Sequence, residues 1–232
     1  MSAEVNSSMV GDSRALELRS GSAALVRRPS TRFTTGLKLA GNGVVVVGGL
    51  AAWLPVIILP LLGVWAWGPF QLVTAMMVGT LWAIALTDNG SLCGNRRLRE
   101  ASLADLKARH PQLASNCIGF VGLSTHGHLL RQFQRFDTHE DVGSLCATPR
   151  SLIFLGDSID LSIARAAITA IEFRIDPCCS FIGLHWIRLS YTDGDATRYL
   201  YLQSRDRDRL SDLPRRNNAL LKRLQGWVGG SV

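Results

Sequence analysis

The sequence predicts an α+β protein, with an N-terminal transmembrane helical hairpin followed by a small antiparallel β-barrel that a C-terminal helix closes. Three observations support this fold class. Residues 39–86 are mostly apolar and contain no Asp, Glu, Lys or Arg. Residues 117–203 contain short runs in which apolar and polar residues alternate, which is the period of a half-buried strand. Residues 213–228 carry leucines at helical spacing and end at two glycines.

Residues 1–36 are predicted to form a disordered cytoplasmic tail. They are rich in Ser, Ala, Arg and Thr and show no apolar periodicity. Segments of this composition bury too little apolar surface to offset the entropy of ordering the chain.

Residues 37–87 are predicted to form the membrane hairpin. A helix over 39–64 would be about 39 Å long and a helix over 70–86 about 26 Å long, which is enough to cross a bilayer. Basic residues lie outside both ends of the hairpin, at Arg27, Arg28, Arg32 and Lys38 and at Arg96, Arg97 and Arg99. Because basic residues stay on the cytoplasmic side, we expect an integral protein of the cytoplasmic (inner) membrane with both termini cytoplasmic.

Two alternatives to the hairpin fit less well. A cleaved signal peptide is a poorer interpretation, because the apolar region starts late and is too long. A buried helical hairpin of a soluble protein would show amphipathic faces, and these two stretches show none.

Residues 88–115 are predicted to be a juxtamembrane connector that contains a helix over 96–110. The helix ends at His110-Pro111 because the residue before proline disfavours the helical conformation. Residues 116–232 are predicted to form the barrel domain. Its strands are expected at 117–124, 142–148, 150–155, 159–163, 168–175, 185–192 and 198–203. Asp193-Gly194 indicates a hairpin turn. Asp212 and Pro214 mark the start of the closing helix.

Three stretches carry a resemblance to a known superfold: Glu140–Gly143, Ser151–Asp157 and Ile168–Ile171. Together with the order of strands and final helix, they resemble the pleckstrin-homology (PH)-like group, which includes the bacterial PH and GRAM domains. The resemblance covers about residues 116–228 and rests on pattern alone. It implies a binding or scaffolding module, in a superfold that binds lipids, peptides and proteins.

Phosphoinositide-binding members of the PH-like group carry Lys and Arg around their first two strands, so the resemblance implies a ligand site in the same region here. Four residues there are candidates for ligand binding: Arg131, Arg135, His126 and His128. Asp137, Glu140 and Asp141 lie among them and dilute the positive charge. A solvated polar loop is therefore the favoured interpretation, with an anionic lipid headgroup as the alternative ligand.

Neither a metal nor a cofactor is predicted. His126, His128, His139 and Asp141 are of the types that bind zinc, but their spacing does not fix a complete ligand set. The five cysteines include no C-x-x-C pair, and their odd number favours free thiols in a reducing compartment over a disulfide framework.

The sequence predicts a binding protein and no enzyme. It contains no G-x-S-x-G, H-E-x-x-H, Walker or G-x-G-x-x-G motif. The net charge of +7 is spread over residues of both signs, which is a weak signal for nucleic acid. We expect a membrane-anchored cytoplasmic module that binds a protein partner. A sensor of lipid headgroups in the same membrane is the alternative, and an unrecognised membrane-bound hydrolase is a weaker one.

Overall fold

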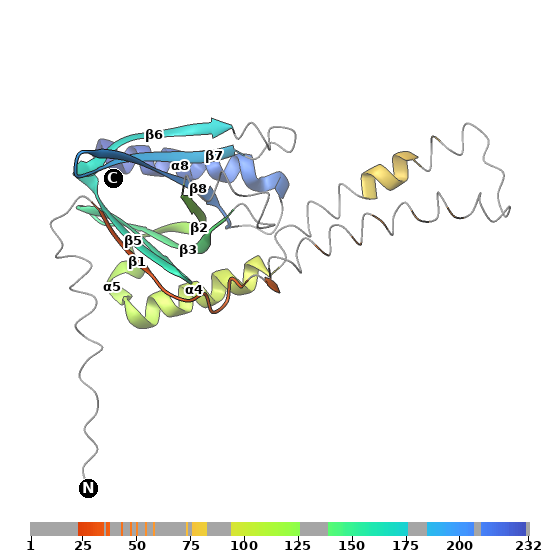
Figure 1. Ribbon diagram of the computed structural model, residues 1–232, viewed down its shortest axis with the longest axis horizontal. Helices are drawn as coiled ribbons and strands as arrows, with labels where there is room; N and C mark the ends of the chain where they lie inside the picture. Colours follow the sequence, from red (N-terminus) through yellow and green to blue (C-terminus); the bar gives the residue numbers. More distant parts are fainter. Residues whose placement is uncertain are drawn as a thin grey trace, which may run out of the picture.

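The computed structural model describes residues 23–34, 36–37, 43, 47, 50, 54, 58, 73, 76–82, 94–125, 139–175, 185–206 and 210–230. Eight strands form one antiparallel sheet in the order β1-β5-β4-β3-β2-β8-β7-β6 (Figure 1). The strands are β1 (Ala23–Arg27), β2 (Cys117–Thr125), β3 (Asp141–Ala147), β4 (Ser151–Gly156), β5 (Ile159–Ala164), β6 (Ile168–Ile175), β7 (His185–Asp193) and β8 (Ala196–Ser204). Among the described residues, the helices with complete bounds are α4 (Asn95–Arg109), α5 (Pro111–Ala114) and α8 (Leu213–Gly229), residues 76–82 are also helical, and short 3-10 turns lie at η2 (Arg165–Ala167) and η4 (Leu210–Asp212).

Two runs of consecutive antiparallel strands build the sheet. Strands β2 to β5 form one run and β6 to β8 the other, and β8 pairs with β2 to join them. Strand β1 arrives from a distant part of the chain and pairs with the outer edge of β5. The N-terminal strand therefore lies at one end of the sheet and β6 at the other.

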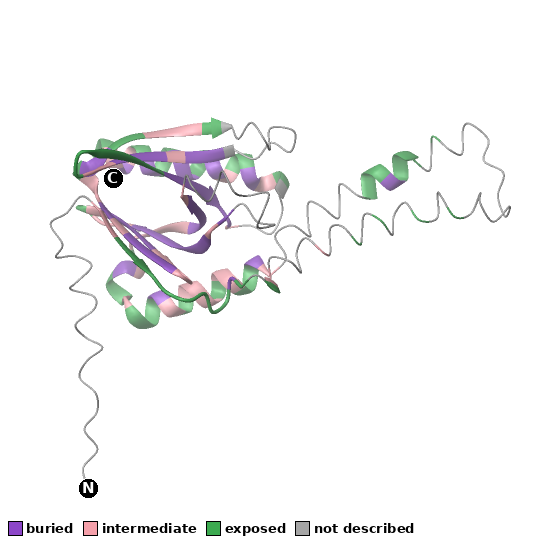
Figure 2. Ribbon diagram, in the orientation of Figure 1, coloured by how far each residue is buried: buried purple, intermediate pink, exposed green. Residues whose placement is uncertain are grey.

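The main core lies between the sheet and α8. Every strand from β2 to β8 contributes a buried apolar side chain to one cluster, which Leu220, Leu221, Leu224 and Trp227 of α8 complete. Figure 2 colours much of the sheet as buried. The Trp227 Nε1–H also donates a hydrogen bond of 2.7 Å to the Thr148 carbonyl oxygen, so the helix is fixed by polar contact as well as by packing.

The opposite face of β3 and β4 is covered by α4 and α5. Leu106 and Leu113 from these helices pack on Cys146 and Ile153 of the strands. Because both faces of β4 are buried, its residues 152–155 are apolar without interruption, where a half-buried strand would alternate.

The helix α8 has clear end signals. Pro214 lies in its first turn, and Gly230 ends it with a φ of 80°, in the left-handed region that favours glycine. Asp212 occupies the N-cap position but forms no side-chain capping hydrogen bond.

The predicted closed barrel is wrong. Strands β1 and β6 end the hydrogen-bonded order, so the sheet is open. The strand periodicity in a sequence shows that strands exist, but it does not show whether the last strand pairs with the first. The extra strand β1, which takes the free edge of β5, was also not predicted.

The predicted transmembrane hairpin is corrected as well. Most of residues 37–87 lie outside the described residues, and in the part of the chain that the structure does describe no helix is long and apolar enough to cross a bilayer. A charge-free apolar stretch is necessary for a span, but a continuous helix of about 20 residues is required too. The predicted integral membrane location rested on this hairpin and is corrected on the same finding.

Candidate functional site

Residues 23–34, called the N-terminal segment below, lie against the domain as an extended strand followed by a turn. Residues Ala23 to Arg27 pair in antiparallel register with Ile163 to Ile159 of β5. Leu25 is 49% exposed and Val26 is 46% exposed, so burial of side chains contributes little here. The strand is held mainly by backbone pairing, which is how a sheet edge binds an extended peptide.

Two arginines, Arg27 at the end of β1 and Arg28 directly after it, pair with acidic residues of the domain. Arg27 pairs with Glu140, and Arg28 Nη2 lies 2.7 Å from Asp160 Oδ1. The Arg28 backbone N–H donates a hydrogen bond of 2.7 Å to the Ser158 carbonyl oxygen. Burial raises the pKa of Asp160, and the positive charge of Arg28 acts in the opposite direction. Arg28 therefore compensates a carboxylate that the domain holds partly out of water.

Asp157, in the turn between β4 and β5, receives most of the hydrogen bonds from the rest of the segment. Its carboxylate accepts them from the backbone N–H groups of Thr31, Arg32 and Phe33 at 2.7, 2.7 and 2.9 Å. The hydroxyls of Ser30 and Thr31 donate to it at 2.7 and 2.6 Å. Burial raises the pKa of Asp157, but these hydrogen bonds outweigh it and hold the pKa well below its usual range. Asp157 is therefore a fixed negative charge around which the segment turns.

The end of the segment is anchored by one aromatic and one charged residue. The Phe33 side chain is 4% exposed and packs with Phe120 and Val142. The Arg205 guanidinium lies 5.3 Å from the Phe33 ring centroid, in cation–π geometry. Next to it, Arg32 Nη1 lies 2.7 Å from Asp105 Oδ2 of α4, and this hydrogen bond lowers the pKa of Asp105.

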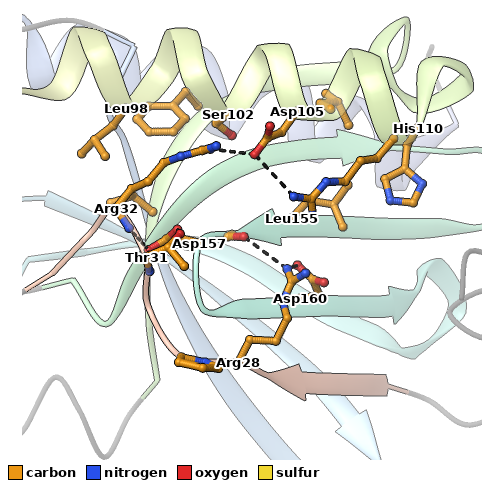
Figure 3. Close-up of a pocket in the computed structure, with 16 residues that line it drawn as sticks. Arg28, Thr31, Arg32, Leu98, Ser102, Asp105, His110, Leu155, Asp157 and Asp160 are labelled. Carbon is orange, nitrogen blue, oxygen red and sulfur yellow. Dashed lines mark hydrogen bonds and ion pairs between the residues drawn. The ribbon is translucent and has the colours of Figure 1, made fainter. Parts of the chain in front are cut away.

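A cavity of about 350 Å³ remains between the N-terminal segment, α4 and the outer face of β3 to β5. Figure 3 shows Arg32 reaching to Asp105 and Arg28 reaching to Asp160 across it. Its charged lining residues are Arg28, Arg32, Arg109, Asp105, Asp157 and Asp160, with His110 beside them. The positive and negative groups balance, so the cavity is not a concentrated site for a phosphate group.

We call the β5 edge together with Asp105, Glu140, Asp157 and Asp160 the β5 docking site. The site therefore combines the backbone edge of β5 with four acidic side chains. Such a site suits an extended segment that carries arginines, because charge-assisted hydrogen bonds between guanidinium and carboxylate are stronger than neutral ones.

The four ligand-binding candidates predicted from the sequence, His126, His128, Arg131 and Arg135, lie in residues 126–138, outside the described residues. Their role, and the alternative of a lipid headgroup, therefore stays a prediction. In the described part of the chain, no group of three or more His, Cys, Asp and Glu side chains is arranged to hold a metal ion.

Two other residues that the sequence offered as zinc ligands are described, and both have other partners. His139 is buried, with its ring centroid 5.1 Å from that of Trp186. A Cβ at Gly122 would lie 1.9 Å from the His139 ring, so the histidine fills space that only glycine leaves free. The Asp141 carboxylate accepts hydrogen bonds from the N–H groups of Val142, Ser158 and Ile159 at 2.8, 2.8 and 2.7 Å.

The residues that the structure brings together at this site were not predicted from the sequence. Gly156-Asp157-Ser158 indicated only a turn, and Arg27-Arg28 was interpreted as a determinant of membrane topology. The signal present was charge complementarity: two arginines before a proline in the tail, and Asp157 and Asp160 in one short turn region. No family model, curated protein or solved structure matches the chain, so these comparisons add nothing to the geometry of the site.

Proposed function

We propose that this chain is a non-catalytic protein-binding module whose β5 docking site recognises an extended, arginine-containing polypeptide segment. One observation carries the proposal. The N-terminal segment occupies the site through backbone pairing with β5, through Arg28 on Asp160 and through the hydrogen bonds to Asp157. The N-terminal segment is thus an intramolecular example of the proposed ligand.

The contacts of the N-terminal segment have the features of peptide recognition. Backbone pairing along an edge strand gives affinity that does not depend on side chains. The paired charges of Arg28 and Asp160 fix the register, and a buried aromatic anchor such as Phe33 supplies apolar contact. The proposed ligand is therefore an extended strand followed by Arg-Arg, a turn with hydroxyl residues, and an aromatic residue.

The resemblance of residues 116–228 to the PH-like group supports the same class of function. That superfold hosts binding sites for peptides and proteins as well as lipids. The resemblance rests on the sequence pattern alone and stays a prediction.

A segment from a partner protein has to compete with the N-terminal segment for the same edge. The N-terminal segment belongs to the same chain, so its binding is intramolecular and its effective concentration at the site is high. A free peptide must displace it in order to bind. We therefore expect the full chain to bind such a peptide more weakly than a chain without its first 34 residues.

A synthetic peptide with the sequence of residues 23–34 and a fluorescent label tests the proposal. Fluorescence anisotropy is measured against the full chain and against a chain that starts at residue 35, after circular dichroism has shown that the shortened chain retains its β structure. The proposal expects saturable binding to the shortened chain, at least about tenfold weaker binding to the full chain, and no binding of a scrambled peptide. Equal binding of the scrambled and native peptides would contradict it.

A further inference from the structure

Two cysteines face each other across neighbouring strands on the side of the sheet covered by α5. Cys117 at the start of β2 is the register partner of Cys146 in β3, and both are free thiols. Both belong to the apolar cluster that includes Leu113 of α5. Their side chains therefore point to the same face of the sheet.

The hydrogen bonds of the ladder indicate how close the two residues are. The Ala147 N–H donates to the Asn116 carbonyl oxygen at 2.9 Å, so a backbone hydrogen bond joins the two strands directly beside Cys117 and Cys146. Cys117 and Cys146 are register partners, and residues directly opposite each other in an antiparallel ladder have Cα atoms about 4.5–5.5 Å apart. A disulfide requires a Cα separation of about 4.4–6.8 Å. The backbone thus holds the pair at a distance that a disulfide can bridge.

The two thiols differ in exposure and in acidity. Cys146 is completely buried, whereas Cys117 is only partly buried. A hydrogen bond from Cys146 lowers the pKa of the Cys117 thiol to about 7, against the opposing effect of burial. The interaction with Cys117, together with burial, raises the pKa of Cys146. Cys117 is therefore the thiol that reaches a reagent and reacts first, because the thiolate is the nucleophile.

We propose that Cys117 and Cys146 form a redox modification site that takes low-molecular-weight disulfides, such as oxidised glutathione, as its substrates. The Cys117 thiolate attacks one sulfur of the external disulfide, whose S–S bond breaks and releases one thiolate, which takes up a proton. Cys146 then gives up its proton to solvent, and its sulfur attacks Cys117 Sγ and displaces the second external thiolate, which is protonated in turn. Two protein thiols are oxidised to one disulfide, and one external disulfide is reduced to two thiols.

The new bond would close a covalent ring over residues 118–145. It would tie β2 to β3 at the irregularity between Cys117 and Gly119, where the register of the two strands shifts. A cross-link of this kind restricts the unfolded chain and raises the melting temperature. The ring would also enclose residues 126–138, which contain all four ligand-binding candidates from the sequence.

The test uses the full chain in which Cys93, Cys178 and Cys179 are replaced by Ser, so that only the pair can react. The chain is incubated with oxidised and reduced glutathione in varied ratios near pH 7.5, then alkylated, digested with trypsin and analysed by mass spectrometry. The proposal expects one cross-linked product that joins the tryptic peptides 110–131 and 136–150. It also expects a melting temperature that is higher for the oxidised chain and that returns to its original value after reduction with dithiothreitol.

Two matched variants identify the roles of the thiols. Cys146→Ser should leave a stable glutathione adduct on Cys117, because no second thiol can resolve it. Cys117→Ser should slow the reaction with glutathione disulfide at least about tenfold, because the remaining thiol is buried. A glutathione adduct that persists on Cys117 when both cysteines are present would overturn the proposal, as would two thiols that stay open to alkylation in excess oxidised glutathione.

Discussion

Phe33 and Asp157 lie 124 residues apart in the chain, and the backbone N–H of Phe33 donates a hydrogen bond of 2.9 Å to the Asp157 carboxylate. The N–H groups of Thr31 and Arg32 converge on the same oxygen, Asp157 Oδ2. Successive backbone N–H groups that point at one anion form a recognised type of anion-binding turn. Here the anion belongs to the domain and the turn belongs to the N-terminal segment, which identifies the segment as a ligand of the domain.

Asp157→Asn should release the N-terminal segment. The substitution removes the negative charge and leaves only one acceptor oxygen for several donors, and hydrogen bonds to charged groups contribute about 1.5–3 kcal/mol each. We expect trypsin to cut after Arg27 and Arg32 at least about tenfold faster than in the native chain. Asp195→Asn, in the exposed β7–β8 turn, is the matched control and should leave the cutting rate unchanged. Equal protection of the native and Asp157→Asn chains would refute the role of Asp157.

Phe33→Ala should weaken docking of the segment through loss of a buried aromatic anchor. Truncation of a buried phenylalanine lowers the free energy of unfolding by about 3–5 kcal/mol. If the segment detaches, the loss cannot exceed the free energy that its docking contributes. Urea denaturation of the full chain measures the effect. Leu25→Ala, at a half-exposed position in β1, should cost less than about 0.5 kcal/mol. The same loss at both positions would show that Phe33 is not an anchor.

Leu224→Ala should destabilise the whole domain, because Leu224 is completely buried in the main core. The expected loss in the free energy of unfolding is about 2–5 kcal/mol. Lys222→Ala, on the exposed face of the same helix α8, is the control and should change it little. A loss below about 0.5 kcal/mol at Leu224 would mean that α8 does not complete the core.

The rate of alkylation of Cys117 should rise with pH, with a midpoint at about pH 7, because the thiolate is the reacting form. Cys146→Ala removes the thiol that donates a hydrogen bond to the Cys117 thiolate, so the midpoint should move up toward the ordinary value of 9.0. Near pH 7 the variant should therefore react several-fold more slowly with iodoacetamide. An unchanged midpoint would show that Cys146 does not stabilise the thiolate.

Much of the domain could be predicted from the sequence because its elements carry local signals. Strands β2 to β8 begin and end within two residues of the predicted ranges, and α4 spans Asn95–Arg109 against a predicted 96–110. Alternation marks strands such as β5, and Asp193-Gly194 marks the turn before β8. These signals depend only on residues near one another in the chain.

The docking site could not be predicted because its signals are not local. Strand β1 is held by backbone pairing and leaves Leu25 and Val26 about half exposed, so it shows no alternation. Arg28 and Asp160 become partners only when the chain has folded. The hairpin prediction relied on apolar composition, segment length and flanking basic residues, which are necessary for a membrane span but do not by themselves show one.

Hydrogen exchange at the Phe33 backbone amide of the full chain, followed by NMR, reports docking of the N-terminal segment at Asp157 and so tests recognition at the β5 docking site. We expect exchange at least about tenfold slower than in the Asp157→Asn chain. We also expect an excess of the unlabelled peptide of residues 23–34 to speed this exchange by displacing the segment. Exchange as fast as in the free peptide, or protection that the peptide leaves unchanged at saturating concentration, would contradict recognition of such a segment at the β5 docking site.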